Sequence, residues 1–150
     1  KFKKEPKLAF DRLGEIATRL PGYPLVMHGS SSVPPELVAI INQYGGQMKP
    51  TWGVPGEEIQ RGIKHGVRKV NIDTDNRMAM TGQYRKVAAE KKAEFDPRAF
   101  NNAAMAAMTE VCVERYERFD TVGNASKIKA IPLSEMAGRY NSGALDPQVK

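Results

Sequence analysis

The feature that most constrains the fold is that only two short segments have the pattern of sheet strands, and each lies between helical segments. Residues 24–28 (PLVMH) form a short apolar run before Gly29, which is typical of a strand buried on both faces. Residues 67–73 (VRKVNID) alternate between apolar and polar side chains, as a second strand does. Strands that alternate with helices form parallel sheets, and two such strands are not a stable sheet alone. We therefore expect an α/β fold in which further strands lie in apparent loops or in a longer polypeptide.

Apolar residues spaced three and four positions apart predict helices around both strands. A first helix over 8–20 carries Leu13, Ile16, Ala17 and Leu20 on one face. Further helices are expected to begin at Pro34-Pro35, at Pro55, at an N-cap formed by Thr74 or Asp75, and at Asp96-Pro97, and a short one is expected to end near Tyr140. The helix that begins at Asp96-Pro97 should run to about Arg118, because its apolar positions continue that far.

The net charge of +6, from 23 Lys+Arg against 17 Asp+Glu, raises the question of a polyanionic partner. The basic residues are scattered, and the only clusters lie near the ends of the chain, at Lys1, Lys3, Lys4 and Lys7 and at Lys127 and Lys129. Nucleic-acid binders usually gather basic residues on one face with aromatic residues among them. The pattern therefore favours a solvated surface over a nucleic-acid interface, and it leaves open the binding of small phosphorylated molecules.

Composition also restricts the setting of the protein. No apolar run approaches the ~18 residues that a membrane-spanning helix needs, so we expect no membrane partner. The single Cys112 cannot form an internal disulfide, and no leader segment precedes the first helix, which favours the cytoplasm. Because residue 1 is Lys rather than Met, we expect the numbering to begin inside a longer gene product.

The end of the first expected strand has the residues of an anion site. Residues 28–32 (HGSSS) follow the strand directly, and the carboxyl ends of parallel strands are where α/β proteins bind ligands. Gly29 lets backbone N–H groups approach an anion, and the serines add hydroxyl donors. Gly-Ser loops without a ligand are also common, and His28 fits a structural role and a metal-ligand role equally well.

The end of the second expected strand strengthens that interpretation. Asn71 and Asp73 should share the face of the strand that opens on the ligand side. Thr74 and Asp75 follow at once, and the alternative is that Asp73, Thr74 or Asp75 simply caps the next helix. A buried Asn needs hydrogen-bond partners, which a sugar hydroxyl or carbonyl would supply. Together the two strand ends favour a site for a phosphate and hydroxyl groups.

Arg98 is poorly placed for helix stability. A cation in the first turn opposes the helix macrodipole, and a bound anion would reverse that penalty. The alternative is a solvated Arg98 beside Asp96. His65, at a helix C-terminus before Gly66, favours a structural role, and His28 and His65 alone do not make a zinc site.

Two separated motifs resemble the class II, metal-dependent fructose-bisphosphate aldolases. They are residues 28–34 (HGSSSVP) and 62–82 (GIKHGVRKVNIDTDNRMAMTG), and the similarity extends from Pro6 to Lys129. The resemblance implies the C-terminal part of a (β/α)₈ TIM barrel, with its last two strands and their helices, plus a helical C-terminal extension. Residues 1–95 would belong to the barrel, and residues 96–150 would be the extension and tail of the same domain.

The resemblance also implies roles for the residues at the first strand end. His28 matches a zinc-ligand histidine, so Zn²⁺ is the implied cofactor. Gly29 and Ser31 match the loop that holds the phosphate of dihydroxyacetone phosphate. A monovalent cation, Na⁺ or K⁺, is implied near the carbonyl of Gly29.

At the second strand end, Asn71 matches a catalytic position, and Asn71, Asp73 and Thr74 match the positions that bind the dihydroxyacetone phosphate half of the substrate. Arg98 matches an arginine that reaches the site of a neighbouring subunit and pairs with the second phosphate. A homodimer or homotetramer is therefore implied. The other two zinc histidines of the family, its aspartate acid/base and its mobile glutamate loop would lie upstream of Lys1.

The implied reaction is the reversible aldol cleavage of fructose 1,6-bisphosphate to dihydroxyacetone phosphate and glyceraldehyde 3-phosphate, in glycolysis and gluconeogenesis. A tagatose- or sedoheptulose-bisphosphate aldolase of the same family remains an alternative, as does a non-catalytic module that binds a phosphorylated ligand. Because so much of the family's site would lie upstream, we expect this segment to lack a complete active site. The rest of the same polypeptide would be its first partner, together with the sugar bisphosphate.

Overall fold

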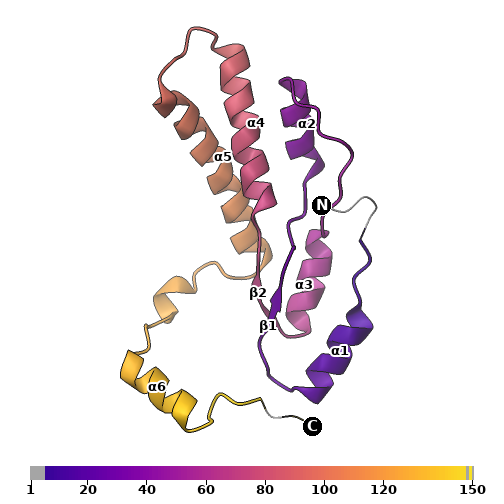
Figure 1. The fold of residues 1–150 in the computed structure, drawn as a ribbon, viewed down its shortest axis with the longest axis vertical. Helices are drawn as coiled ribbons and strands as arrows, with labels where there is room; N and C mark the ends of the chain where they lie inside the picture. Colours follow the sequence, from indigo (N-terminus) through magenta and orange to yellow (C-terminus); the bar gives the residue numbers. More distant parts are fainter. Residues whose placement is uncertain (1–5, 148, 150) are drawn as a thin grey trace.

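The computed structural model describes residues 6–147 and 149, and Figure 1 shows their arrangement. In chain order the elements are α1 (Phe10–Arg19), β1 (Leu25–Met27), α2 (Pro35–Gln43), α3 (Gly56–Lys64), β2 (Val67–Val70), α4 (Thr74–Glu90), α5 (Pro97–Arg118), the 3-10 helix η1 (Ala125–Lys127) and α6 (Leu133–Asn141). The helices expected from the sequence are confirmed. The clustered Lys1, Lys3 and Lys4 lie outside the described residues.

The two strands pair in parallel, as the alternation of strands and helices predicts. Leu25 lies opposite Val67 and Met27 opposite Val70, with an irregularity between Leu25 and Val26. The ladder continues beyond the strands, because the Asn71 N–H donates to the Met27 carbonyl at 3.0 Å. The carboxyl ends of β1 and β2 therefore meet at one edge, and α2 and α4 continue from that edge (Figure 1).

Two expectations about the strands are wrong in detail. The first strand was expected to be buried on both faces, but Val26 is 49% exposed, because two strands and their helices do not cover both faces of a sheet. The second strand was expected to reach residue 73, but it ends at Val70, opposite Met27, the last residue of β1. Asp73 instead has the N-cap position of α4, with φ of −134°. The alternation of faces therefore does not extend to Asp73.

The helix starts show why these segments are helical. Pro97 occupies the first turn of α5, and the Asp96 carboxylate accepts from the Arg98 N–H at 2.8 Å, as expected for an N-cap followed by proline. Of the three residues considered as the cap of α4, neither Thr74 nor Asp75 has that position. Asp73 holds the N-cap position without a side-chain hydrogen bond, and Asp75 is fully buried because its carboxylate binds the loop after β1.

Beyond the carboxyl ends of the strands, α4 packs against α2 and against α5 (Figure 1). A hydrophobic core cluster of Val33, Ile41 and Met78 joins the loop after β1 to α2 and α4. Gly82 allows α2 and α4 to approach closely, since a Cβ there would lie 2.7 Å from Ile40 Cγ2. The loop after β1 is thereby attached to α2 and α4, and through α4 to α5.

The C-terminal segment is less covered than the rest. Figure 1 shows α6 apart from the group of α2, α4 and α5, and Ile128 and Leu133 are 76% and 86% exposed. The expected division after residue 95 falls between α4 and α5, which pack together along their length, and it stays a prediction. None of the helices in the described part of the chain is both long and apolar enough to cross a membrane.

Candidate functional site

The ends of the two strands bring His28 and Asn71 into contact, as the parallel arrangement predicts. Asn71 Nδ2 lies 2.8 Å from His28 Nδ1. The Lys69 ammonium donates to Asn71 Oδ1, so the amide turns its nitrogen toward the imidazole. The side-chain amide of Asn71 then donates from Nδ2 to His28 Nδ1. With Nδ1 acting as the acceptor, a neutral His28 carries its ring proton on Nε2. Lys69, Asn71 and His28 thus form a polar chain across the ends of β2 and β1.

The serine loop after β1 is joined to the start of α4. The Ser31 hydroxyl oxygen accepts from the backbone N–H groups of Asp73 at 3.3 Å and Thr74 at 3.1 Å. Ser30 is fully buried and donates its hydroxyl to the Met27 carbonyl at 3.0 Å. Gly29 has φ of 66°, a conformation that glycine adopts without strain. The expected phosphate loop therefore lies at a helix N-terminus, where backbone N–H groups favour anions.

Asp73 and Thr74 lie where the sequence predicts, but Asp73 is not directed as expected. Its side chain is 69% exposed and accepts from Arg77 Nε at 3.0 Å, one turn along α4. Thr74 is the first residue of α4 and is half-buried. The backbone N–H groups of both residues, rather than their side chains, make the contact with the loop after β1.

Arg98 is the one predicted site residue that this chain does not bring to the others. It lies in the first turn of α5, beyond the C-terminal end of α4. The 17 residues of α4 span about 25 Å and separate Arg98 from the strand ends. Its side chain is 85% exposed and pairs with Asp96 at 2.5 Å. The Arg98 guanidinium lowers the pKa of Asp96, and the Asp96 carboxylate raises the pKa of Arg98. Within one chain, Arg98 is therefore a solvated side chain paired with Asp96, which is the alternative that the sequence left open.

Two residues near the site were missed from the sequence. Lys69 shares the face of β2 with Asn71, two positions on, and the period of a strand could have revealed it. For Asp75, the local sequence predicts only a possible cap. Its carboxylate accepts from the N–H groups of Ser32 and Val33, both at 2.8 Å, and binds Arg115 at 3.3 Å. Nothing in the local pattern distinguishes such an aspartate from a cap.

For His28 to bind a metal ion, further ligands must come from outside the described residues. Among the described residues, no group of three or more His, Cys, Asp or Glu side chains is close enough to hold a metal ion. His28 offers one imidazole, whereas structural and catalytic zinc sites have at least three protein ligands. The residues present therefore do not hold zinc by themselves.

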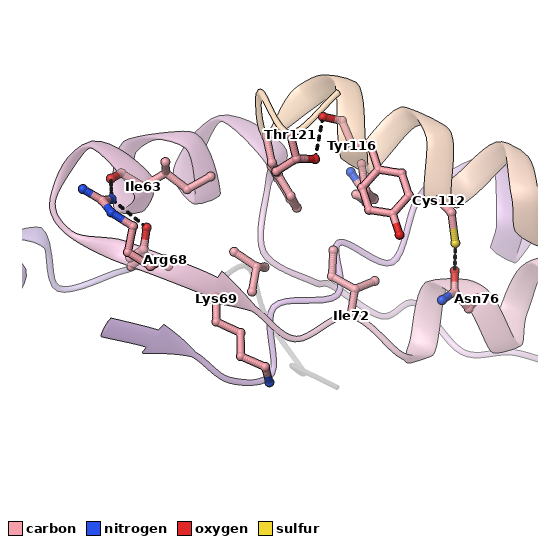
Figure 2. A pocket seen from close by; sticks show the side chains of 12 residues that line it. Ile63, Arg68, Lys69, Ile72, Asn76, Cys112, Tyr116 and Thr121 are labelled. Carbon is pink, nitrogen blue, oxygen red and sulfur yellow. Dashed lines mark hydrogen bonds between the residues drawn. The ribbon is translucent and has the colours of Figure 1, made fainter. Parts of the chain in front are cut away.

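A hollow of about 530 Å³ lies between β2 and the C-terminal half of α5 (Figure 2). Its lining includes Ile63, Ile72, Cys112 and Tyr116, and Cys112 Sγ lies 3.9 Å from Asn76 Oδ1. None of the predicted site residues is among its described lining residues. This mostly apolar hollow adjoins the polar chain of Lys69, Asn71 and His28 through Lys69, which is among its lining residues.

Comparison with known proteins gives consistent results along the chain. The family model described as "Fructose-bisphosphate aldolase class-II" matches residues 1–124. The chain is 56% identical to a fructose-bisphosphate aldolase of Nostoc commune and 55% identical to one of Pseudomonas aeruginosa, over 100% and 99% of its length. It is 58% identical to fructose-bisphosphate aldolase 1 of Cereibacter sphaeroides, over 99% of its length. The chain spans 43%, 43% and 42% of these relatives.

Proposed function

The chain belongs to the class-II fructose-bisphosphate aldolase family, and we propose that the polypeptide containing it catalyses the reversible aldol cleavage of fructose 1,6-bisphosphate. The products are dihydroxyacetone phosphate and glyceraldehyde 3-phosphate, and the reaction serves glycolysis and gluconeogenesis in the cytoplasm. The observation that carries the proposal is the 2.8 Å contact between His28 and Asn71, which joins the two family motifs at one edge of the sheet.

The two strands and their helices are the C-terminal part of a (β/α)₈ barrel. Because the chain spans 43% of the relative from Nostoc commune, we expect the remaining strands to come from an upstream part of the same polypeptide. That part would also supply the other zinc ligands, the aspartate acid/base and the glutamate loop. Residues 1–150 alone would then have no complete active site.

The loop after β1 and the start of α4 support binding of the dihydroxyacetone phosphate end of the substrate. The N–H groups of Asp73 and Thr74 already converge on one oxygen, that of Ser31. A phosphate oxygen near them would accept from the same helix N-terminus and from the Ser31 hydroxyl. Gly29, with no side chain, leaves its backbone open to the phosphate, and its carbonyl would face a monovalent cation, Na⁺ or K⁺.

His28 would be one of the zinc ligands, and Asn71 would hold its ring while no metal is bound. A metal ion takes the lone pair of a ring nitrogen, so binding at Nδ1 competes with the hydrogen bond from Asn71. Zn²⁺, when bound, would act as a Lewis acid on the substrate carbonyl. The Asn71 amide, once free of the imidazole and still held by Lys69, could donate to the oxygen on which negative charge develops.

Arg98 would act in the site of a neighbouring subunit of a homodimer or homotetramer. Its exposure of 85% and its place at the far end of α4 support this role. A second phosphate would offer it more acceptor oxygens than Asp96 does. The two phosphates of the substrate would then be held by different chains.

The test is an activity assay of the complete polypeptide loaded with Zn²⁺. Release of triose phosphate is measured with fructose 1,6-, tagatose 1,6- and sedoheptulose 1,7-bisphosphate, and residues 1–150 alone are the control. We expect the highest kcat/KM with fructose 1,6-bisphosphate and no turnover by the control. A preference for another sugar would identify a sister aldolase. Binding of dihydroxyacetone phosphate without any cleavage would point to a non-catalytic module.

A further inference from the structure

Asp75 makes contacts that the proposed function does not use. Its side chain is fully buried at the start of α4. Oδ2 accepts from the Ser32 N–H and Oδ1 from the Val33 N–H, each at 2.8 Å. Both acceptor atoms of one carboxylate are thus directed at two consecutive amides that directly follow Ser31.

The backbone that Asp75 holds is in an unfavourable conformation. Val33 has φ of 52°, a region that β-branched residues avoid. Its side chain is nevertheless buried with Ile41 and Met78. The hydrogen bond from its N–H group to Asp75 is one of the contacts that offset this strain. Loss of that bond would let residues 31–33 relax, and the Ser31 hydroxyl would move with them.

Arg115 holds the carboxylate from the other side. Its guanidinium lies 3.3 Å from Asp75 Oδ2 and 2.9 Å from a Glu114 carboxylate oxygen, and its side chain is 10% exposed. Burying a carboxylate is costly unless it has a charged partner. The guanidinium is that partner, while the two oxygens of Asp75 accept from the two amides of the loop. Helix α5 is therefore part of the support of the loop after β1.

We infer that Asp75, held by Arg115, is a positioning residue that fixes the Ser31–Val33 backbone in the conformation needed to bind the substrate phosphate. The inference rests on the proposed function, because it assigns the loop after β1 to a phosphate of the sugar bisphosphate. Asp75 itself touches the loop and Arg115, and it acts on the substrate through Ser31.

The test compares Asp75→Asn with Val87→Ala in the complete, zinc-loaded polypeptide. Asn offers one acceptor oxygen in place of two, so one loop amide loses its partner while the volume is unchanged. Val87→Ala is the matched control, because Val87 is buried in the same helix, 7% exposed, and lies about 18 Å along α4 from Asp75. KM and kcat for fructose 1,6-bisphosphate and the thermal midpoint are measured for each.

A purely structural role and a positioning role differ in their kinetics. Partial unfolding lowers the amount of active enzyme and so lowers apparent kcat with KM unchanged, whereas a misplaced phosphate loop raises KM. We expect Asp75→Asn to raise KM about tenfold, the factor of one lost hydrogen bond to a charged group. Val87→Ala should lower the thermal midpoint by an amount similar to Asp75→Asn but leave KM unchanged.

Arg115→Met is the second variant, which removes the ion pair but leaves the Asp75 side chain in place beside the loop. We expect a smaller rise in KM than for Asp75→Asn. Equal KM values for Asp75→Asn and Val87→Ala would overturn the inference. If Asp75→Asn does not fold, an unchanged KM for Arg115→Met would overturn it instead. An unmodified polypeptide that does not cleave the sugar would contradict the proposed function, which is a distinguishable failure.

Discussion

Two aspartate–arginine pairs lie at opposite ends of the α4–α5 hairpin, in different surroundings. At the strand end, Asp75 and Arg115 have side-chain exposures of 0% and 10%. At the turn between the helices, Asp96 and Arg98 have exposures of 32% and 85%. The shorter contact belongs to the exposed pair, at 2.5 Å against 3.3 Å. The distance between charged atoms is therefore a poor guide to what each pair does.

Solvent determines the difference between the pairs. Water and salt screen the Asp96–Arg98 pair, so it can exchange its partner for another anion at little cost. Removing either partner of the Asp75–Arg115 pair leaves a buried charge without compensation. The buried pair suits a fixed support and the exposed pair suits a contact that forms with a ligand. The proposed roles of Asp75 and Arg98 follow this division.

The largest expected effect is at the strand end, for His28→Ala in the complete polypeptide. Loss of one imidazole from a three- or four-ligand site should remove zinc and reduce kcat/KM by at least about a thousandfold. Zinc is measured by elemental analysis of the purified protein, and activity by triose phosphate release. His65→Ala is the control, because His65 caps α3 through Arg61. Zinc that stays stoichiometric in His28→Ala would show that the ligand assignment is wrong.

The next effect concerns stability at the same end of the hairpin. Asp75→Ala should lower the free energy of unfolding by about 3–5 kcal/mol, because it leaves Arg115 buried without its partner. Chemical denaturation of the complete polypeptide measures this. The double variant Asp75→Ala, Arg115→Met should lose less than the two single variants combined. Strictly additive losses would mean that the pair is not coupled, contrary to the contrast drawn above.

The sequence was sufficient to predict the elements that repeat a simple pattern. The helix that carries Leu13 and Ile16 and the Asp96-Pro97 start of α5 are local signals, and the structure has both, with Leu20 as the C-cap of α1. The parallel pairing of the two strands was also predicted, and because parallel strands end at the same edge, it places His28 and Asn71 together. Family resemblance added roles for those residues.

The sequence was insufficient where a residue is defined by distant partners. Asp75 resembles any helix cap in the local pattern, and its three partners, Ser32, Val33 and Arg115, are about 40 residues away in the chain. The exposure of Val26 also follows from what covers the sheet rather than from its neighbours. The end of β2 at Val70 depends on where its partner strand ends. Such properties belong to the tertiary arrangement.

A smaller effect is expected at the exposed end, for Arg98→Ala in the complete polypeptide. Since Arg98 would pair with the second phosphate, the variant should raise KM for fructose 1,6-bisphosphate about tenfold or more. Binding of dihydroxyacetone phosphate, measured by calorimetry, should change much less, as should the thermal midpoint. Equal losses for both ligands would contradict a contact with the second phosphate. Arg77→Ala, whose arginine pairs with Asp73 on α4, provides a control at the other end.

The smallest effect is the pH dependence of the exposed pair. The Arg98 guanidinium and N–H hold the pKa of Asp96 below its ordinary value of 3.8, so the ionised carboxylate is favoured in the folded state. A lowered pKa contributes stability that is present above the ordinary value and is lost as the pH falls through the folded one. Thermal midpoints of the unmodified protein and of Asp96→Asn should therefore differ slightly at pH 7 and converge as the pH falls from the ordinary value of 3.8 through the lowered one. Asn keeps the N-cap acceptor, so the difference isolates the charge. If the difference in thermal midpoint instead widens on acidification, Arg98 does not stabilise the Asp96 carboxylate. The two exposed side chains would then be independent, without even a weak coupling between them.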